Sequence, residues 1–209
     1  MNLQTQWKTL CQKMQTTGDV ELAYWRLHLY YTEPHRAYHT LEHIAEGLQD
    51  LKDAIHYAEH PTAVEMAWWH HDAVYQIGKK DNEENSALLA AIQCLKLGLP
   101  NAFAQRTGEL VLATQHLEPP KDIDAQLLVD TDLSILGKPD EVFDRYEHSI
   151  WTEYVQNDGV PETFFKTRRA EILEQFLRHP TIYTTEFYRA KYEGKARENL
   201  ERSIRQLRR

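Results

Sequence analysis

The side chains that could do chemistry are histidines and aspartates, and they fall in three stretches of the chain. Imidazole and carboxylate groups together form ligand sets for several first-row divalent metal ions, and carboxylates also suit Mg²⁺. A divalent ion held in this way can activate a bound water molecule for hydrolysis. The three stretches contain His39 and His43, then His70, His71 and Asp72, and finally Asp130 and Asp132.

The first pair, His39 and His43, is spaced as one face of a helix requires, because residues four apart lie one turn from each other. Two imidazoles in that arrangement can converge on one ion. The chain contains 11 His, so such a pair also arises by chance. A structural or surface role is therefore the alternative to metal binding.

The second stretch carries the strongest physical signal. Residues 62–75 are predicted to form a helix that is apolar nearly all round, and such a helix belongs at the centre of a fold. An unpaired carboxylate there, at Asp72, would cost several kcal/mol or would take up a proton. A bound cation shared with imidazoles is the simplest compensation, and it favours a metal site.

The third stretch places Asp130 and Asp132 in an otherwise apolar helix. A solvated helix edge would explain either acid alone. Because both flanks are apolar, we expect at least one of the two carboxylates to face inward.

Helices must position these groups. The 209 residues include only 8 Gly and 8 Pro, and apolar residues recur at intervals of three and four throughout. Pro61, Pro100, Pro139 and Pro161 each stand where a helix would begin. We predict an all-α bundle of roughly eight to ten helices without strands. It would form one domain over residues 1–209, with the metal site within about 24–137 and C-terminal helices over 139–209 packed on it.

Composition limits the classes of partner. The net charge of −8 argues against stable nucleic-acid binding as the main task. No apolar run is long enough to cross a membrane, and the first residues lack a signal-peptide pattern. Cys11 and Cys94 cannot form a disulfide framework. These features predict a cytoplasmic protein, while its oligomeric state stays open.

The order of the motifs resembles the HD superfamily of metal-dependent phosphohydrolases, in which an H…HD…D set binds one or two divalent metals within a helical bundle. The pattern Tyr38-His39-x-x-x-His43 and the run Asp132-Leu133-Ser134 are also similar to motifs of cyclic-nucleotide phosphodiesterase catalytic domains in that superfamily. Nearly the whole chain resembles a bacterial family of predicted HD phosphohydrolases of about this length. Further shared features are His71-Asp72-Ala73-Val74-Tyr75, the Asp-Asn-Glu-Glu-Asn-Ser-Ala run over 81–87, the Asp-x-Asp-Leu-x-Ile-Leu-Gly run over 130–137 and Ala196-Arg197-x-Asn199-Leu200.

This resemblance implies a ligand set and catalytic roles. The implied metal ligands are His43, His71, Asp72 and Asp132, with Asp72 able to bridge two ions. His39 would be a general acid or an extra ligand. Asp130 is the less suitable ligand of its pair, because the Leu-Ser context follows Asp132. The chain lacks the recognisable nucleotide pocket of the phosphodiesterases, so specificity for cyclic nucleotides is not implied.

The expected reaction is hydrolysis of a phosphoester in a small phosphorylated or nucleotide-like substrate, through water activated by Mn, Mg, Fe, Co, Ni or Zn. Two alternatives belong to other classes. One is a non-catalytic helical module, stabilised by a metal, that acts as a sensor or partner-binder. The other is a di-iron oxygenase of the HD type.

Three residues are candidates for supporting roles around the site or against the substrate. Glu84 lies in the first turn of the helix expected after residue 81. For this stretch, helix capping by Asp81 or Asn82 is the alternative to a role at the site. His116 ends a helix, where a histidine also suits the helix dipole. Asp130 is the third.

Overall fold

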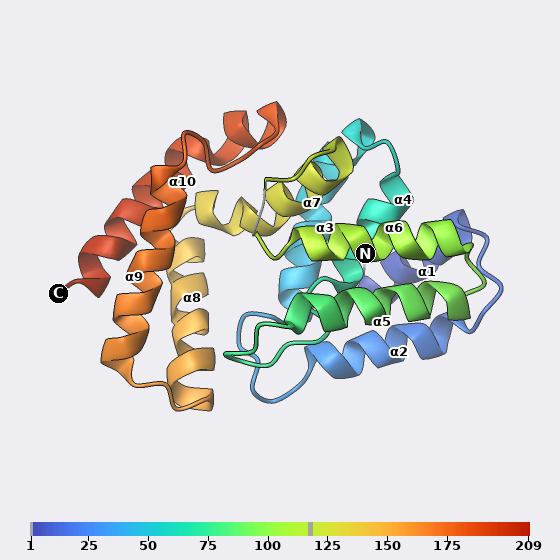
Figure 1. The fold of residues 1–209 in the computed structure, drawn as a ribbon, viewed down its shortest axis with the longest axis horizontal. Helices are drawn as coiled ribbons and strands as arrows, with labels where there is room; N and C mark the ends of the chain where they lie inside the picture. Colours follow the sequence, from blue (N-terminus) through green and yellow to red (C-terminus); the bar gives the residue numbers. More distant parts are fainter. Residues whose placement is uncertain (1, 117–118) are drawn as a thin grey trace. The chain divides into compact units, whose positions relative to one another are not determined.

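The computed structural model describes residues 2–116 and 119–209. Over these residues it contains ten α-helices and no strand, which confirms the predicted all-α class (Figure 1). The helices are α1 (Leu3–Lys13), α2 (Val20–Tyr31), α3 (Leu41–Ala54), α4 (Pro61–His70), α5 (Asn82–Lys96), α6 (Asn101–Ala113), α7 (Ile123–Asp132), α8 (Asp140–Trp151), α9 (Glu162–Arg178) and α10 (Glu186–Leu207). The short helical segments are η1 (Ile55–Tyr57), η2 (Leu133–Gly137) and the π-helical η3 (Thr152–Asn157).

The chain forms two units. The first comprises the residues up to Glu33 together with His39–Val129, and the second comprises Pro34–Tyr38 together with Asp130–Arg209. The sequence predicted one domain whose C-terminal helices begin at residue 139. The boundary in the structure falls earlier, inside α7, and it also assigns the short segment before His39 to the second unit.

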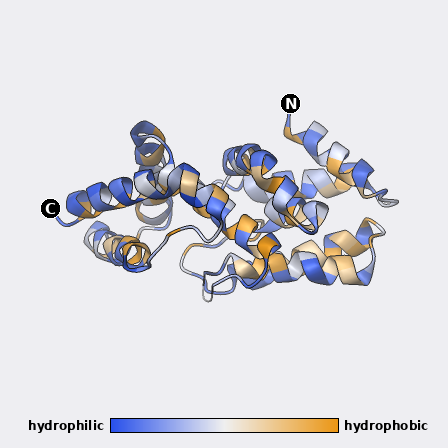
Figure 2. Cartoon of the chain, turned by 90° about the horizontal axis from the view of Figure 1, so that it is seen from above, coloured by the Kyte–Doolittle hydropathy of each residue, from blue (hydrophilic) through white to orange (hydrophobic). Residues whose placement is uncertain are grey.

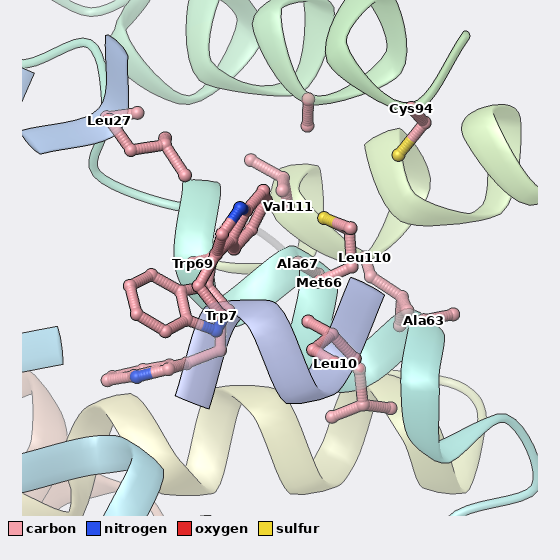
Figure 3. Packing of buried hydrophobic residues seen from close by; sticks show 14 of the residues in the cluster. Trp7, Leu10, Leu27, Ala63, Met66, Ala67, Trp69, Cys94, Leu110 and Val111 are labelled. Carbon is pink, nitrogen blue, oxygen red and sulfur yellow. The ribbon is translucent and has the colours of Figure 1, made fainter. Parts of the chain in front are cut away.

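The core of the first unit is built around α4, as expected from its apolar sequence. The side chains of Ala63, Val64, Met66, Trp68 and Trp69 are at most 1% exposed. Figure 3 shows part of this packing, in which residues of α1, α2, α5 and α6 surround α4. The surrounding residues labelled there are Trp7, Leu10, Leu27, Cys94, Leu110 and Val111.

A glycine allows α3 to approach α4 closely. A Cβ atom on Gly47 would overlap the indole ring of Trp68, so no larger residue fits at this crossing. The indole Nε1 of Trp68 also donates a hydrogen bond of 2.9 Å to the carbonyl of Ile44 in α3. The position of Trp68 is therefore determined by α3 as much as by its own helix.

Prolines mark the starts of four helices as predicted. Pro61 is the first residue of α4, while Pro100, Pro139 and Pro161 immediately precede α6, α8 and α9. Because a proline lacks an N–H group, it costs least at a helix start, where that group has no partner within the helix.

The second unit packs η2, α8 and α9 with the long helix α10. Gly137 of η2 lies against Tyr192, and the amide of Asn199 donates to the carbonyls of Leu136 and Lys138 at 2.9 and 2.8 Å. The helix that ends at the C-terminus is largely hydrophilic toward its end (Figure 2). This unit is therefore organised around η2, which directly follows Asp132.

Buried Glu153, in η3, ties the segment Pro34–Tyr38 to the second unit. Its Oε1 atom accepts hydrogen bonds from the backbone N–H groups of Ala37 and Tyr38 at 2.7 and 2.8 Å. The amide of Asn157 also donates to the carbonyl of His35 at 3.0 Å. The backbone just before His39 is held by these bonds.

None of the described helices combines the length and the apolar character that a membrane crossing requires.

Candidate metal centre

The helix that carries the His-His-Asp run is shorter than predicted. The sequence favoured a helix over 62–75, but α4 ends at His70, and His71 is its C-terminal cap. Asp72 therefore lies outside the helix, in the turn that follows, with its side chain 17% exposed. The prediction of a carboxylate within an apolar helix was wrong in this respect, although the carboxylate still lies at the edge of the buried core.

Two side chains of α5 explain why the helix stops. Ser86 accepts a hydrogen bond from the N–H of Val74 and donates one to its carbonyl, at 3.0 and 3.2 Å. Asn82 does the same for Gln76, at 3.0 and 2.9 Å. The backbone after Asp72 thus finds its hydrogen-bond partners in α5 rather than in a continued helix. Asn82 thus supports the turn after Asp72, and of the two predicted cap candidates it is Asp81 that occupies the N-cap position of α5, without a capping bond from its side chain.

His43, His71 and Asp72 bring three donor atoms together within the first unit. The Nε2 atoms of His43 and His71 are 3.1 Å apart. Oδ2 of Asp72 lies 2.9 Å from Nε2 of His71 and 3.6 Å from Nε2 of His43. Both histidines are buried. Residues from the starts of α3 and of the turn after α4 therefore form a group that could hold a metal ion.

A hydrogen bond from Nδ1 orients the ring of His71. Its Nδ1 atom lies 2.9 Å from the carbonyl oxygen of Trp68, and since a carbonyl only accepts, Nδ1 carries the proton. In the neutral ring Nε2 is then the unprotonated nitrogen, which is the form that binds metals. The ring also stacks on Trp68, with centroids 4.2 Å apart and planes at 22°.

The neighbouring His70 has a structural role. It is fully buried, and its Nδ1 donates to the carbonyl of Met66 at 2.8 Å. Burial lowers the pKa of His70 to about 4, so the ring is neutral at pH 7.

His39 does not pair with His43 in the predicted way. The helix α3 begins at Leu41 with Thr40 as its cap, so His39 precedes the helix instead of sharing a face with His43. The two ring centroids are 6.3 Å apart. His39 instead stacks on Tyr75, with centroids 4.0 Å apart and planes at 28°. Tyr75 was not singled out from the sequence, since it reads there as a core aromatic.

The two acids of the third stretch have different surroundings. Asp130 is fully buried, and its carboxylate accepts hydrogen bonds from the backbone and the hydroxyl groups of both Thr184 and Thr185, at 2.7–3.2 Å. Asp130 thereby holds the turn before α10, a role internal to the second unit. Asp132, the last residue of α7, is partly exposed.

Of the two glutamates at the start of α5, Glu84 is exposed and Glu83 is partly buried. Burial raises the pKa of Glu83, and the negative charge of Asp72 raises it further, while His116 lowers it. Glu83 thus shares an electrostatic environment with Asp72 and His116. His116 itself is exposed, and it follows α6 with a positive φ of 54°.

The sequence did contain a signal for Glu83. Ala87, Ala90 and Cys94 form the buried stripe of α5, and Glu83 extends this stripe by one turn at the same three-to-four spacing. Glu84 falls on the stripe of exposed Leu88 instead.

Comparisons of the chain with protein-family models, with curated proteins and with solved structures found no match.

Proposed function

We propose that the protein is a metal-dependent phosphohydrolase of the HD type. The observation that supports this proposal is the convergence of two imidazole nitrogens and a carboxylate oxygen, separated by 2.9–3.6 Å. Ligand atoms on one first-row divalent ion lie about 2.0–2.2 Å from it, and therefore roughly 3 Å from one another. The donor set fits such an ion in both chemistry and spacing.

In this proposal His43, His71 and Asp72 hold the ion, and the resemblance to the HD superfamily assigns Asp132 as a further ligand. Two neutral imidazoles and two carboxylates suit Mn, Fe, Co, Ni and Zn, and they also accept Mg through the carboxylates. Four such ligands would fill a tetrahedral zinc site, whereas a six-coordinate ion such as Mn²⁺ or Mg²⁺ would keep two positions for water, as a catalytic metal site requires. A bound ion would lower the pKa of that water and neutralise charge on a phosphoryl group.

His39 is proposed as the residue that protonates the leaving oxygen. Its ring stacks on Tyr75, which limits its rotation and holds it near the ligands without making it one. An imidazole has an ordinary pKa of about 6.5, and proton donation of this kind contributes roughly 10²- to 10⁴-fold to a rate. The substrate class that follows is a small phosphorylated or nucleotide-like molecule.

The test compares metal content and hydrolysis in matched variants. His71→Ala and Asp72→Ala are expected to lose the metal and the activity together, while His39→Ala keeps the metal and turns over about 10²-fold or more slowly. Metal content is measured by elemental analysis after reloading with Mn²⁺, Co²⁺, Ni²⁺, Mg²⁺ or Zn²⁺ in turn. Hydrolysis is screened on generic phosphomonoesters and phosphodiesters, then on phosphorylated metabolites and nucleotides.

His56→Ala is the matched control, because His56 is exposed and belongs to η1, away from the ligands in sequence. It should behave as the unaltered protein. Full activity in Asp72→Ala would end the proposal. Stoichiometric iron with an oxygen-dependent optical change, and no phosphoester cleavage, would replace it by the oxygenase alternative.

A further inference from the structure

A groove of about 420 Å³ lies in the first unit, and none of the residues that line it is a candidate metal ligand. Helices α1 and α3 both pack on α4 and form the two walls of the groove. Glu65 of α4 contributes between them. Specific small-molecule sites are mostly concavities of about 300–1,000 Å³, so this groove is large enough for a ligand.

The α3 wall of the groove has an apolar part, which lies beside the exposed polar side chains of Gln49 and Lys52. Leu48 and Leu51 of α3 are buried there, 6% and 2% exposed, and partly buried Ala45 and Ile55 extend the same surface. Removing the apolar part of a ligand from water onto such a wall is favourable. The wall therefore suits a molecule with an apolar body.

The charged residues of the groove carry a net positive charge of one. Nζ of Lys13 lies 3.9 Å from Oε2 of Glu65, so these two charges offset one another. Lys52 of α3, across the groove from Lys13 of α1, takes part in no ion pair among the residues that the structure describes. Its ammonium group is the one available to an anion, and the groove matches a ligand with a single negative charge.

The groove is also connected to the candidate metal centre through the helices that form it. His43 lies in the first turn of α3, five residues before Leu48. Glu65 lies six residues before His71, which corresponds to about 9 Å of helix. A ligand that moves α3 against α4 would change the separation of the two Nε2 atoms, now 3.1 Å.

We propose that this groove binds a small monoanion with an apolar body, a carboxylate on an alkyl or aromatic skeleton, and that this ligand regulates metal binding at the centre. The binding site rests on the groove alone, whereas its regulatory effect also rests on the proposed function.

Binding is tested by titration calorimetry on the metal-free full chain, with 4-phenylbutyrate as the probe and 4-phenylbutan-1-ol as its uncharged counterpart. The carboxylate should bind about tenfold more tightly than the alcohol, because a hydrogen bond to a charged group contributes that much or more. Lys52→Met, which keeps the apolar stem, should remove this difference. Ala45→Trp should abolish binding of both probes by filling the groove.

Lys166→Met is the control, since Lys166 is a partly exposed lysine of the second unit and its substitution should leave binding unchanged. The thermal unfolding midpoint of each variant checks that it is folded. Equal affinities for carboxylate and alcohol, or full carboxylate affinity in Lys52→Met, would overturn the site.

The regulatory effect is tested by measuring Mn²⁺ affinity with and without saturating 4-phenylbutyrate. The affinity should change about fivefold or more, and Mn²⁺ should change the affinity for the probe by the same factor. An unchanged Mn²⁺ affinity, with the probe bound, would overturn regulation. If Mn²⁺ does not bind at all, the proposed function fails, while the calorimetric result for the groove still stands or falls by itself.

Discussion

His71 uses its two ring nitrogens for different purposes. Nδ1 donates to the carbonyl of Trp68, and Nε2 faces His43 and Asp72. The adjacent His70 donates its Nδ1 proton in the same way to Met66 but is enclosed by the core. Two consecutive residues of one type therefore differ in role because the end of α4 directs one ring toward α3 and the other into the hydrophobic packing.

Substitutions at the two aspartates Asp130 and Asp132 of α7 should separate an effect on stability from an effect on metal binding. Asp130→Asn presents an amide N–H₂ group to donors of Thr184 and Thr185, so we expect a loss of about 2–3 kcal/mol in the free energy of unfolding. Its metal affinity should stay unchanged. Asp132→Asn should show the opposite pattern, with metal affinity at least about tenfold lower.

Urea unfolding and metal titration on both variants measure these two effects. A metal defect in Asp130→Asn of the same size as that in Asp132→Asn would contradict the assignment.

Glu83 and Glu84 form a natural pair of variant and control. Glu83 is partly buried, and burial together with the negative charge of Asp72 raises its pKa, whereas Glu84 is exposed. Groups that support metal ligands typically contribute about 10- to 100-fold to affinity or activity. We therefore expect Glu83→Gln to lower the metal affinity, the hydrolytic activity or both by that factor, and Glu84→Gln to change neither. Titration with Mn²⁺ and steady-state hydrolysis measure the difference, and equal behaviour of the two variants would refute it.

At the scale of elements, a chain of contacts links α3 to His71 at the end of α4. Gly47 leaves room for the Trp68 ring, and that ring stacks on the imidazole of His71. Trp68 also contacts the ring of His43, with centroids 5.0 Å apart. The crossing of α3 and α4 thus places both imidazoles through one tryptophan.

Gly47→Ala tests this chain. An alanine in a helix is ordinarily favoured over glycine by about 1 kcal/mol, so any loss of stability here reports the clash with Trp68. We expect the free energy of unfolding to fall by about 1–3 kcal/mol and the metal affinity to fall with it. Gly194→Ala in α10 is the control, because a Cβ there meets no atom within 4 Å. Chemical denaturation should show Gly194→Ala unchanged or stabilised; the same result for Gly47→Ala would disprove the contact chain.

Asp124, at the start of α7, gives a prediction about how stability depends on pH. Asp124 is buried, and its carboxylate accepts hydrogen bonds from the backbone of Glu59 and His60 and from Arg106. Burial raises the pKa of Asp124, but the hydrogen bonds from His60, Arg106 and Glu59 outweigh this effect and hold the pKa below its ordinary value of 3.8. The stabilisation is therefore complete above pH 3.8 and is lost as the pH falls below it through the pKa of the folded state.

Asp124→Asn should accordingly be less stable than the unaltered protein at pH 7, and the difference should shrink below pH 3.8. Thermal unfolding from pH 7 down to pH 3 measures it. Asp53→Asn, at an exposed aspartate of α3, serves as the control. A stability difference for Asp124→Asn that grows on acidification would contradict the sign.

At the scale of the whole molecule, a bound metal ion should raise the stability of the folded chain. A metal that binds only the folded chain stabilises it by about 2.7 kcal/mol when present at 100 times its dissociation constant. For a chain of this length we expect the unfolding midpoint to rise by about 5–10 °C.

Scanning calorimetry with Mn²⁺ or with a chelator measures this shift. Asp72→Ala should show no metal-dependent shift, and a shift as large as that of the unaltered protein would contradict the site.

The sequence by itself determined the helical class and the location of the core. Apolar residues at three-to-four spacing, few glycines, and prolines at helix starts predict helices wherever they occur, because these signals act within one turn of the chain. The same local reasoning predicted a central helix over residues 62–75, of which the part up to His70 is helical, since a helix that is apolar on all faces is stable only when it is enclosed. It also drew attention to His71 and Asp72, because polar groups beside such a segment need partners.

Only the tertiary structure decided where α4 ends and what surrounds the acidic side chains, because these features depend on residues distant in the sequence. The end of α4 at His70 depends on Ser86 and Asn82, which lie more than ten residues away and supply the hydrogen bonds that a longer helix would have made. The separate surroundings of Asp130 and the exposure of Glu84 depend likewise on which neighbours pack against α7 and α5. Residue spacing sets which face of a helix a side chain occupies, but only packing between helices decides what that face meets.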